Sequence, residues 1–593
     1  MQRAKIVCTL GPASDDRGTI RRLADAGMSV ARLNASHGTT DERAELLSRV
    51  QAADEATADP LAAMIDLRGP EVRTATIAEP IRLPTGSTVR FIKGETATSE
   101  TVGLSHSIAA VEPGDTVLLD DGRIETTVER VDGETVIARV DSGGAVGSRE
   151  GVTPRGVDLG LDLIDDEDRE DLRLAAEHGA DFVAASFVGD AADVYEVVDT
   201  LESFGGTETA VVAKIERGRA IENLDGIIDA ADGVMVARGD LGVECPLEDV
   251  PLIQKRIIRR CVDAGIPVIT ATEMLDSMVS ARRPTRAEAS DVANAVFDGT
   301  DAVMLSAETA AGDYPVEAVE TMARIVRRIE ASGEYAATRD ERVPAAKAGA
   351  RTEALARSAR YLARDIDATA IVVVSESGYT ARRTAKFRPP VPVVAVTPDD
   401  RVRRQLAVAW GIDARYASYS TDIDAILETA VAKATAAGVA ESGDTIVVLS
   451  GMIAGVAGTD ATNTLKVHTV AERLATGRGV VSGRSAGPLV RTDDGDLSGV
   501  QSGAIVALPA GFDGEFDGDV TNIGGIVAVD EGLTGYPAII ARELDVPMVS
   551  GATVPAAVEE GADITVDGDR AVVYEGDVVS RRTNGTETSV RDR

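Results

Sequence analysis

The stretch that most constrains the fold covers residues 211–244, where two short apolar runs each lead directly into charged side chains. Lys214 and Glu216 follow the first run, and a plausible helix separates them from the second. Arg238 and Asp240 follow the second run. This pattern predicts a βαβ unit whose two buried parallel strands end in polar chemistry. A lysine and two carboxylates at such an edge suit a divalent cation and an anionic substrate, although solvated loop charges could explain any one of them.

The same arrangement recurs along the chain. Apolar strand candidates alternate with helical patterns over residues 1–72 and again over 157–335, and together they give eight strands, the number of a (β/α)8 TIM barrel. Polar residues follow nearly every strand, namely Arg32, Asp66, Ser186, Lys214, Asp240, Thr272 and Ser306. Helix capping could account for Ser186 and Ser306, but not for the whole ring. We expect the ring to form an active site at the C-terminal rim of the barrel.

Changes in the pattern of apolar runs and turn residues along the sequence predict further domains. Residues 74–156 consist of short alternating runs separated by Pro-Gly, Asp-Gly and Gly-Gly turns, which predicts a small inserted β domain of the kind that often forms a lid. An α/β pattern occupies residues 341–475, and a Gly- and Val-rich β pattern follows. The predicted order is the barrel's first part (1–73), the β lid (74–156), the barrel's second part (157–340), an α/β allosteric domain (341–475) and an additional β-rich domain (476–593).

The net charge of −37 arises from 98 acidic against 61 basic residues, and the acids are dispersed over all regions. Nucleic acid is not an expected partner, because there is no basic patch to release counterions. Such a surface resembles that of halophilic, and in particular haloarchaeal, proteins, whose self-repulsion molar salt screens. An ordinary acidic protein is the alternative. The chain has no apolar run long enough for a membrane span and no signal-peptide core at residues 1–12, so we expect a cytoplasmic protein.

Long sequence blocks stand at the strand ends described above. They read KIVCTLGPAS (5–14), GMSVARLNASHG (27–38), IDLRGPEVRT (65–74), AKIER (213–217), DGVMVARGDLGVE (232–244), ITATEMLDSM (269–278) and PTRAEASDVANAVFDGTDAVMLSAETA (284–310). In this order they resemble the pyruvate kinase family over about residues 1–475. The resemblance implies phosphoryl transfer from phosphoenolpyruvate to ADP, giving pyruvate and ATP in the last step of glycolysis. It also implies Mg²⁺ or Mn²⁺, usually K⁺, and a homotetramer.

The resemblance assigns the substrate side of the site. Glu216 and Asp240 match the ligands of the Mg²⁺ ion that holds the substrate, and such hard oxygen donors suit that ion. Lys214 and Arg32 match the cations at the transferring phosphoryl group. The remaining matches are Gly239 at the carboxylate pocket, Thr272 near the carbon that is protonated, and Ser306 and Glu308 in a proton relay.

The resemblance also assigns a monovalent-cation site and a nucleotide side. Potassium ligands are matched by Asn34, Ser36, Asp66 and the carbonyl of Leu67. Glu71 is the residue of potassium-dependent members, whereas Leu67 is less typical of them. The nucleotide side is matched by Asn34, His37 and Arg73. The family's arginine after Ser-Phe-Val is Gly189 here, and the usual lysine-rich loop reads Ser-Arg-Glu-Gly at 148–151.

The turn after residues 370–374 carries hydroxyls and a glycine at the start of a predicted helix, namely Ser375, Ser377, Gly378 and Thr380. Such a turn can cradle an effector phosphate, and a helix N-cap with a neighbouring turn explains it nearly as well. Glu376 stands where animal and yeast enzymes carry a lysine for fructose 1,6-bisphosphate. We therefore expect a sugar monophosphate or AMP, if any effector acts.

Residues 531–547 resemble the mobile phosphohistidine domain of phosphoenolpyruvate synthase and its relatives. Gly535 and Tyr536 stand where the histidine would be, and tyrosine cannot serve as a phosphohistidine carrier. A structural or regulatory role is therefore expected. Two alternatives remain. A phosphoenolpyruvate synthase or dikinase-like phosphotransferase is disfavoured by Tyr536, and a non-catalytic relic is disfavoured by the intact residues Lys214, Glu216, Asp240 and Thr272.

Overall fold

The computed structural model describes residues 2–418, 423–450 and 464–579. The chain separates into two compact units. The first comprises Met1–Tyr361, Val372–Ala430 and Leu449–Thr464, and the second comprises Leu362–Ile371, Val431–Val448 and Leu465–Arg593. Within the described residues, no helix combines the length and the apolar character that crossing a membrane requires.

The first unit contains a closed parallel barrel, as predicted. Its strands follow the order β1-β16-β15-β14-β13-β12-β3-β2, and every neighbouring pair is parallel. The strands are β1 (Lys5–Leu10), β2 (Val30–Asn34), β3 (Ala62–Asp66), β12 (Phe182–Ala185), β13 (Ala210–Ile215), β14 (Gly233–Ala237), β15 (Val268–Ala271) and β16 (Ala302–Leu305). Because they are buried almost throughout, they read as continuous apolar runs in the sequence.

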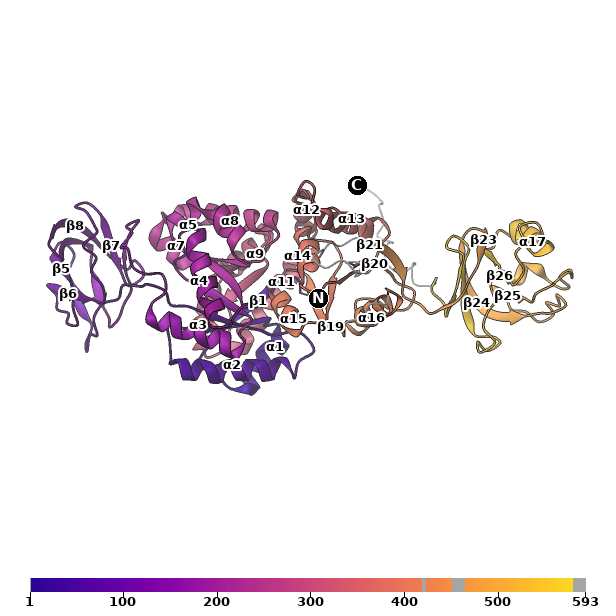
Figure 1. Cartoon of the computed structure of the whole chain (residues 1–593), viewed down its shortest axis with the longest axis horizontal. Coiled ribbons are helices and arrows are strands. Elements are labelled where there is room, and N and C mark those ends of the chain that lie inside the picture. Colours follow the sequence, from indigo (N-terminus) through magenta and orange to yellow (C-terminus); the bar gives the residue numbers. More distant parts are fainter. Residues whose placement is uncertain (1, 419–422, 451–463, 580–593) are drawn as a thin grey trace. The chain divides into compact units, whose positions relative to one another are not determined.

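Helices surround the barrel strands in Figure 1. They are α1 (Arg17–Ala26), α2 (Thr40–Asp54), α3 (Asp166–His178), α4 (Ala191–Ser203), α5 (Gly218–Glu222), α6 (Leu224–Ala230), α7 (Arg238–Glu244), α8 (Val250–Ala264), α9 (Arg286–Asp298), α10 (Ala307–Ala310) and α11 (Pro315–Glu330). Capping boxes at Thr39 with Glu42 and at Thr285 with Glu288 fix the starts of α2 and α9. The helix predicted between Glu216 and the second strand is divided at Asn223 into α5 and α6.

The barrel interior is filled by apolar side chains from all eight of its strands, including Val7, Met64, Met235 and Ile269. Two residues from a distant part of the chain, Ala407 and Val408, belong to the same cluster. They lie on the 3-10 helix η3 (Leu406–Val408). The α/β region therefore contributes part of the barrel's own core.

The inserted region is all β, as its turn-rich sequence predicts. A six-stranded sheet has the order β11-β7-β8-β9-β5-β6, and β4 pairs with β10. The strands are β4 (Ile81–Leu83), β5 (Thr88–Lys93), β6 (Thr101–Leu104), β7 (Thr116–Leu119), β8 (Ile124–Asp132), β9 (Thr135–Ser142), β10 (Gly144–Val146) and β11 (Val152–Pro154). These strands enclose a separate apolar core that includes Leu83, Phe91 and Val117.

The α/β region has a five-stranded sheet in the order β19-β18-β17-β20-β21. Its strands are β17 (Ala370–Val374), β18 (Val393–Thr397), β19 (Ile412–Tyr416), β20 (Thr445–Ser450) and β21 (Thr464–Thr469). Its helices are α12 (Gly333–Glu341), α13 (Arg351–Asp365), α14 (Tyr379–Lys386), α15 (Asp400–Gln405) and α16 (Ile423–Ala436). The sequence pattern predicts β17, β18 and β20 but misses β21 and β19, and the alternation of β19 ends in Arg415 and Tyr416.

In the second unit an eight-stranded sheet has the order β22-β29-β28-β24-β25-β26-β27-β23. The strands are β22 (Arg473–Thr476), β23 (Arg478–Val481), β24 (Arg484–Arg491), β25 (Ala504–Leu508), β26 (Ile523–Ala528), β27 (Met548–Ser550), β28 (Asp563–Asp567) and β29 (Val572–Glu575). One longer helix, α17 (Tyr536–Leu544), accompanies them (Figure 1). The β-rich character predicted for this region is confirmed.

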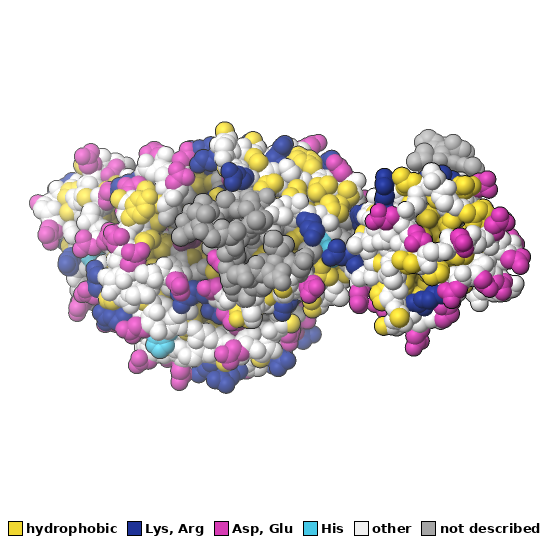
Figure 2. Space-filling model, turned by 45° about the vertical axis from the view of Figure 1, so that its right-hand side comes forward, with side chains coloured by type: hydrophobic (Ala, Val, Ile, Leu, Met, Phe, Trp, Pro, Cys, Tyr) yellow, Lys and Arg dark blue, Asp and Glu magenta, His cyan; other side chains and the backbone are white. Residues whose placement is uncertain are grey.

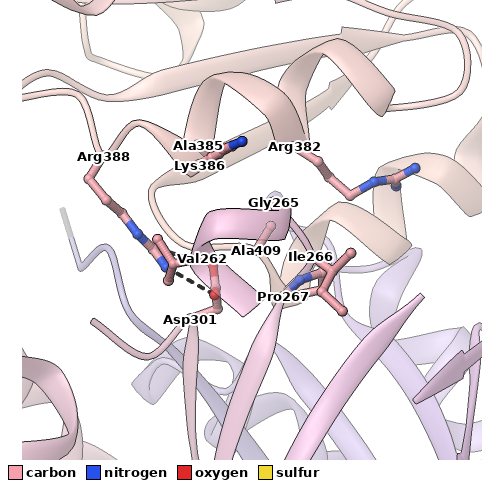
Figure 3. Close-up of a pocket in the computed structure, with 10 residues that line it drawn as sticks. All are labelled: Val262, Gly265, Ile266, Pro267, Asp301, Arg382, Ala385, Lys386, Arg388 and Ala409. Atoms are coloured by element: carbon pink, nitrogen blue, oxygen red, sulfur yellow. Dashed lines mark hydrogen bonds and ion pairs between the residues drawn. The ribbon is translucent and has the colours of Figure 1, made fainter. Parts of the chain in front are cut away.

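The barrel and the α/β region of the first unit are joined by buried ion pairs. Arg388 makes two hydrogen bonds to the carboxylate of Asp301, which precedes β16, and Figure 3 shows this pair beside the end of α14. The same guanidinium lies 4.9 Å from the ring centroid of Trp410, and the Trp410 amide donates to Asp301 Oδ1 at 3.0 Å. Asp and Glu side chains are scattered over the visible surface in Figure 2, as the dispersed acidic sequence implies.

Candidate active site

Lys214 forms the centre of a charged cluster at the C-terminal ends of the barrel strands. Its Nζ lies 3.1 Å from Asp66 Oδ1 and 2.8 Å from Glu216 Oε1, and it donates a hydrogen bond to Ser186 Oγ at 2.7 Å. Burial alone would lower the pKa of Lys214, but the carboxylates of Asp66 and Glu216 more than offset it, so the net pKa lies above the usual lysine value. The ammonium group therefore stays charged.

Arg32 approaches the same cluster from β2. Its Nε donates to Asp66 Oδ2 at 2.6 Å and its Nη1 donates to Thr9 Oγ1 at 2.8 Å. Burial favours protonation of Asp66, yet Arg32 and Lys214 together lower the net pKa of that carboxyl. Asp66 is thus a buried anion that holds two cations in place.

Glu216 and Asp240 are the two carboxylates predicted to bind a divalent cation. Glu216 is buried, and its Oε2 accepts the backbone amide of Phe187 at 2.6 Å. Asp240 lies in the first turn of α7 and is exposed at its surface. Reduced hydration within the barrel mouth and repulsion from Glu216 nevertheless raise the pKa of Asp240 to about 7.

Within the described residues, no group of three or more His, Cys, Asp or Glu side chains is arranged to hold a metal ion. Two carboxylates nevertheless suit Mg²⁺, which commonly keeps several waters and takes its other ligands from substrate oxygens. The mutual repulsion between Glu216 and Asp240 is itself relieved by a cation placed near both. The donor set therefore fits this ion.

Thr272 lies immediately after β15 and faces the start of α7. Its Oγ1 accepts a hydrogen bond from the Gly239 amide at 2.7 Å. The Thr272 backbone has φ 133°, an unusual conformation for a β-branched residue. Strain of this kind persists where the surrounding structure enforces it, and it is common at functional sites.

Glu308 is completely buried, and each of its oxygens accepts a backbone amide. Oε1 accepts from Leu275 at 2.9 Å and Oε2 from Ser306 at 2.6 Å, while burial raises the pKa of the carboxyl. Glu308 therefore connects the loop after β15 with the loop after β16. The Ser306 side chain is half-buried.

The residues matched to potassium ligands lie at the ends of β2 and β3. Asn34 and Asp66 are register partners, and Asn34 Oδ1 accepts the Ser36 amide at 3.2 Å. The Leu67 carbonyl accepts a hydrogen bond from Ser186 Oγ at 2.6 Å. Asp66 Oδ1 is buried without a hydrogen bond beyond its ion pair with Lys214. An oxygen-only set with one under-used buried oxygen fits a monovalent cation.

The two other nucleotide-side residues occupy different places. His37 is exposed, and its carbonyl accepts from Arg43 Nη1 at 3.0 Å. Arg73 pairs with Glu71 and donates to the Arg149 carbonyl at 2.9 Å, so it connects the segment that enters the inserted β region with the segment that leaves it. Among the described residues, the polar partners of Arg73 and of His37 do not overlap.

Some site-supporting residues escape sequence reasoning or depart from the family pattern. Arg238 makes two 2.6 Å hydrogen bonds to the carboxylate of Asp291 on α9, and so anchors the start of α7 rather than facing the cluster. At Gly189 a Cβ atom would lie 3.0 Å from Arg219 Cδ, so another arginine already occupies the space beside this position. Asp291 is distant in sequence from Arg238, and Arg219 is distant from Gly189, so only the fold brings each pair together.

The predicted effector turn precedes α14. Ser377 is exposed and its Oγ accepts the Tyr379 amide at 3.4 Å, Gly378 has φ 72°, and Thr380 is buried. The pocket drawn in Figure 3 lies at the opposite end of α14, against Ala385 and Lys386. None of the four predicted effector residues lines it.

In the second unit Gly535 caps α17 and Tyr536 begins the helix. The Tyr536 ring lies 5.6 Å from that of Phe516, and Phe516 stacks on Phe512 at 5.9 Å. Tyr536, which stands where the sequence resemblance predicts a histidine, is therefore packed into an aromatic cluster.

The sequence matches three protein families in succession. Residues 1–319 match the family described as Pyruvate kinase, barrel domain, and residues 353–468 match Pyruvate kinase, alpha/beta domain. Residues 500–571 match PEP-utilising enzyme, mobile domain. The pyruvate kinases of Geobacillus stearothermophilus and Bacillus licheniformis are each 39% identical to the chain over 585 residues, which is 97% of this chain and 99% of the relative. That of Sporosarcina psychrophila is 37% identical with the same coverage.

Proposed function

The chain belongs to the pyruvate kinase family and is a phosphotransferase, and we propose that its reaction depends on the charged cluster around Lys214. The substrates are phosphoenolpyruvate and ADP, and the products are pyruvate and ATP. The observation that carries the proposal is the contact of Lys214 Nζ with Asp66, Glu216 and Ser186. These contacts keep the ammonium group charged and fix its position, as stabilisation of a transferring phosphoryl group requires.

Arg32 supplies a second cation on the phosphoryl side. Two of its nitrogens are held by Asp66 and Thr9, and the guanidinium fork retains donors for a phosphate oxygen. Asp66 does not touch the substrate in this scheme. It sets the spacing between Lys214 and Arg32.

The bound cations would be held by oxygen ligands of the same cluster. Glu216 and Asp240 would hold Mg²⁺, and Asn34, Ser36, Asp66 and the Leu67 carbonyl would hold K⁺. When bound, such ions neutralise charge that builds up on substrate and phosphoryl oxygens. Glu71 supports potassium dependence.

Protonation of the enolate carbon is assigned to Thr272, which acts through a water molecule rather than as a strong acid itself. Its oxygen already accepts from the Gly239 amide, so its own O–H can donate to a water or to the substrate. Because the Gly239 amide is also proposed to bind the substrate carboxylate, substrate binding would release Thr272 from this contact. Ser306 could relay a replacement proton from solvent towards Thr272, with Glu308 holding the Ser306 backbone.

We propose a structural or regulatory role for the additional domain, residues 476–593, because Tyr536 cannot form the phosphohistidine that a phosphoenolpyruvate synthase or dikinase needs. Stoichiometric acid-labile phosphate on the protein after incubation with phosphoenolpyruvate would contradict this. Adaptation to high salt, a homotetramer and a sugar monophosphate or AMP effector belong to the same proposal, and they rest on the acidic surface, on the family and on the turn before α14 respectively.

The direct test is formation of pyruvate from phosphoenolpyruvate and ADP with Mg²⁺, at low and at molar KCl. We expect ADP-dependent turnover in at least one of these salts. Absence of turnover in every salt, with the protein folded, would overturn the activity and favour the non-catalytic alternative.

A further inference from the structure

Helix α3 reaches two loops at the barrel mouth through two buried acids. The first is Asp168, whose Oδ1 accepts the backbone amides of Arg68 at 3.1 Å and Gly69 at 3.2 Å. These amides directly follow Leu67, so Asp168 fixes the backbone that presents the Leu67 carbonyl. Asp165 caps α3 by accepting the Asp168 amide at 2.7 Å, which holds Asp168 in place.

The second acid is Asp171, one turn further along α3. It forms a two-pronged pair with the buried Arg43, from Nε to Oδ1 and from Nη2 to Oδ2, both at 2.9 Å. Arg43 Nη1 in turn donates to the carbonyls of His37 at 3.0 Å and Gly38 at 3.2 Å. Asp171 therefore holds, through Arg43, the loop that carries Ser36 and follows Asn34.

The two loops held by α3 carry the proposed potassium ligands. Asn34 ends β2 and Ser36 lies on the loop that follows it, while Asp66 ends β3 and Leu67 begins the loop that follows that strand. A cation that takes oxygens from two separate loops depends on their spacing, so its affinity depends on whatever fixes that spacing. Both loops are held by residues of one helix, α3, so this helix fixes their spacing.

The buried carboxylate of Asp168 lowers the stability of the fold, which suggests that it serves a function. Its side chain is buried and its Oδ2 has no hydrogen-bond partner among the described residues. A buried, incompletely paired carboxylate costs free energy, and a neutral side chain would avoid that cost. The negative charge of this carboxylate also favours a cation on the loop that it holds.

We propose that Asp168 and Asp171 are positioning residues that set the affinity of the monovalent-cation site. The inference rests on the proposed function, because the ligands are assigned there. Neither acid is a cation ligand in this scheme. Each acts through the backbone of a loop.

Asp168→Ala tests the contact between α3 and the loop that begins at Leu67. Glu170→Gln is the matched control, because Glu170 is an exposed acid on the same helix. In Asp168→Ala the K⁺ concentration for half-maximal turnover should rise by about tenfold or more, the range found when an outer partner of a metal ligand is removed. Turnover at saturating K⁺ should be retained. Glu170→Gln should keep the wild-type K⁺ dependence.

A second readout needs neither substrate nor turnover. The melting temperature is measured in KCl and in choline chloride of equal concentration, so that general charge screening cancels in the difference. Wild type and Glu170→Gln should show a K⁺-specific rise, and Asp168→Ala should lose most of it. If Asp168→Ala does not fold, Arg43→Lys takes its place, because it keeps the charge but breaks the two-pronged pair.

The outcomes separate the inference from the function. A variant with wild-type K⁺ half-saturation and an unchanged K⁺-specific melting shift would overturn the inference and leave the activity intact. Wild-type turnover without any response to K⁺ would overturn it as well. Absence of pyruvate formation by the wild type would instead refute the proposed function.

Discussion

The amide of Gly239 donates a 2.7 Å hydrogen bond to Thr272 Oγ1, and Thr272 makes this contact from a backbone with φ 133°. A strained residue at the start of one loop is thus connected to the first turn of the helix that carries Asp240. This hydrogen bond links the residue proposed for proton transfer, Thr272, to the proposed carboxylate pocket at Gly239.

Thr272→Val keeps the shape of the side chain but removes the hydroxyl. It should lower kcat by about 10²–10⁴-fold, the usual contribution of a positioned proton-transfer group, with little change in KM for phosphoenolpyruvate. Thr272→Ser, which keeps the hydroxyl, should recover most of the loss. Steady-state kinetics of the two variants decides the matter, and equal kcat values for Val and Ser would exclude a role for the hydroxyl.

Lys214→Met should lower kcat by about 10²–10³-fold, because one charged donor to the transferring phosphoryl group is lost. The matched control is Lys255→Met, which removes an exposed lysine paired with Asp298 on the outer helices. Circular dichroism should show both variants folded. Near-normal turnover of folded Lys214→Met would contradict the central role of the cluster.

The pKa of Asp240, raised to about 7, makes Mg²⁺ binding pH-dependent. The ion binds the deprotonated carboxylate, so below the pKa it must displace a proton, and its apparent affinity should fall by about tenfold per pH unit. Above the pKa the affinity should level off. Titration of Mg²⁺ at about pH 6, 7 and 8 measures this, and Asp240→Asn should bind more weakly and lose the pH dependence.

Arg388→Ala should destabilise the first unit, because it leaves Asp301 buried without its partner, a loss of roughly 3–5 kcal/mol. The protein has one tryptophan, Trp410, and Arg388 lies against its ring. The same substitution should therefore change the intrinsic fluorescence. Arg123→Ala, which removes an exposed arginine of the inserted region, should change neither property.

Self-repulsion from a net charge of −37 should make stability depend on salt. If the protein is adapted to high salt, its melting temperature should rise steeply with KCl and the chain should lose structure at low ionic strength. A melting temperature that is flat over this range would identify an ordinary acidic protein instead.

The barrel could be predicted from sequence because its strands are buried on both faces and therefore read as apolar runs with polar residues after them. Lys214, Asp66 and Ser186 could be assigned to one rim by this rule, and the structure brings them into contact. The rule does not reveal partners that come from helices. Asp168, Arg43 and Asp291 sit inside helical patterns in which an acid or arginine normally faces solvent, and only the fold shows that they are bonded.

Strand β19 was missed for a related reason. Its sequence ends in Arg415 and Tyr416, which weakens the apolar pattern, yet Arg415 is satisfied by Asp413 of the same strand and by Asp59 of the barrel region. A charged side chain in a strand is costly to bury when it has no partner, but the ion pairs of Arg415 remove that cost, and one of those partners is distant in sequence. The inserted β region was easier to predict, because its turns recur at short intervals and each of them carries glycine or proline.

Because Ala407 and Val408 form part of the barrel interior, the barrel and the α/β region depend on each other for folding. A chain ending after the last barrel helix would expose an apolar floor to water, and the free barrel would be prone to aggregate. The α/β region therefore cannot be treated as a detachable accessory, gained or lost as a cassette. Gene fusion and deletion should be tolerated after β21, where the match to the alpha/beta family domain ends at residue 468, and not at the border between the barrel and the α/β region.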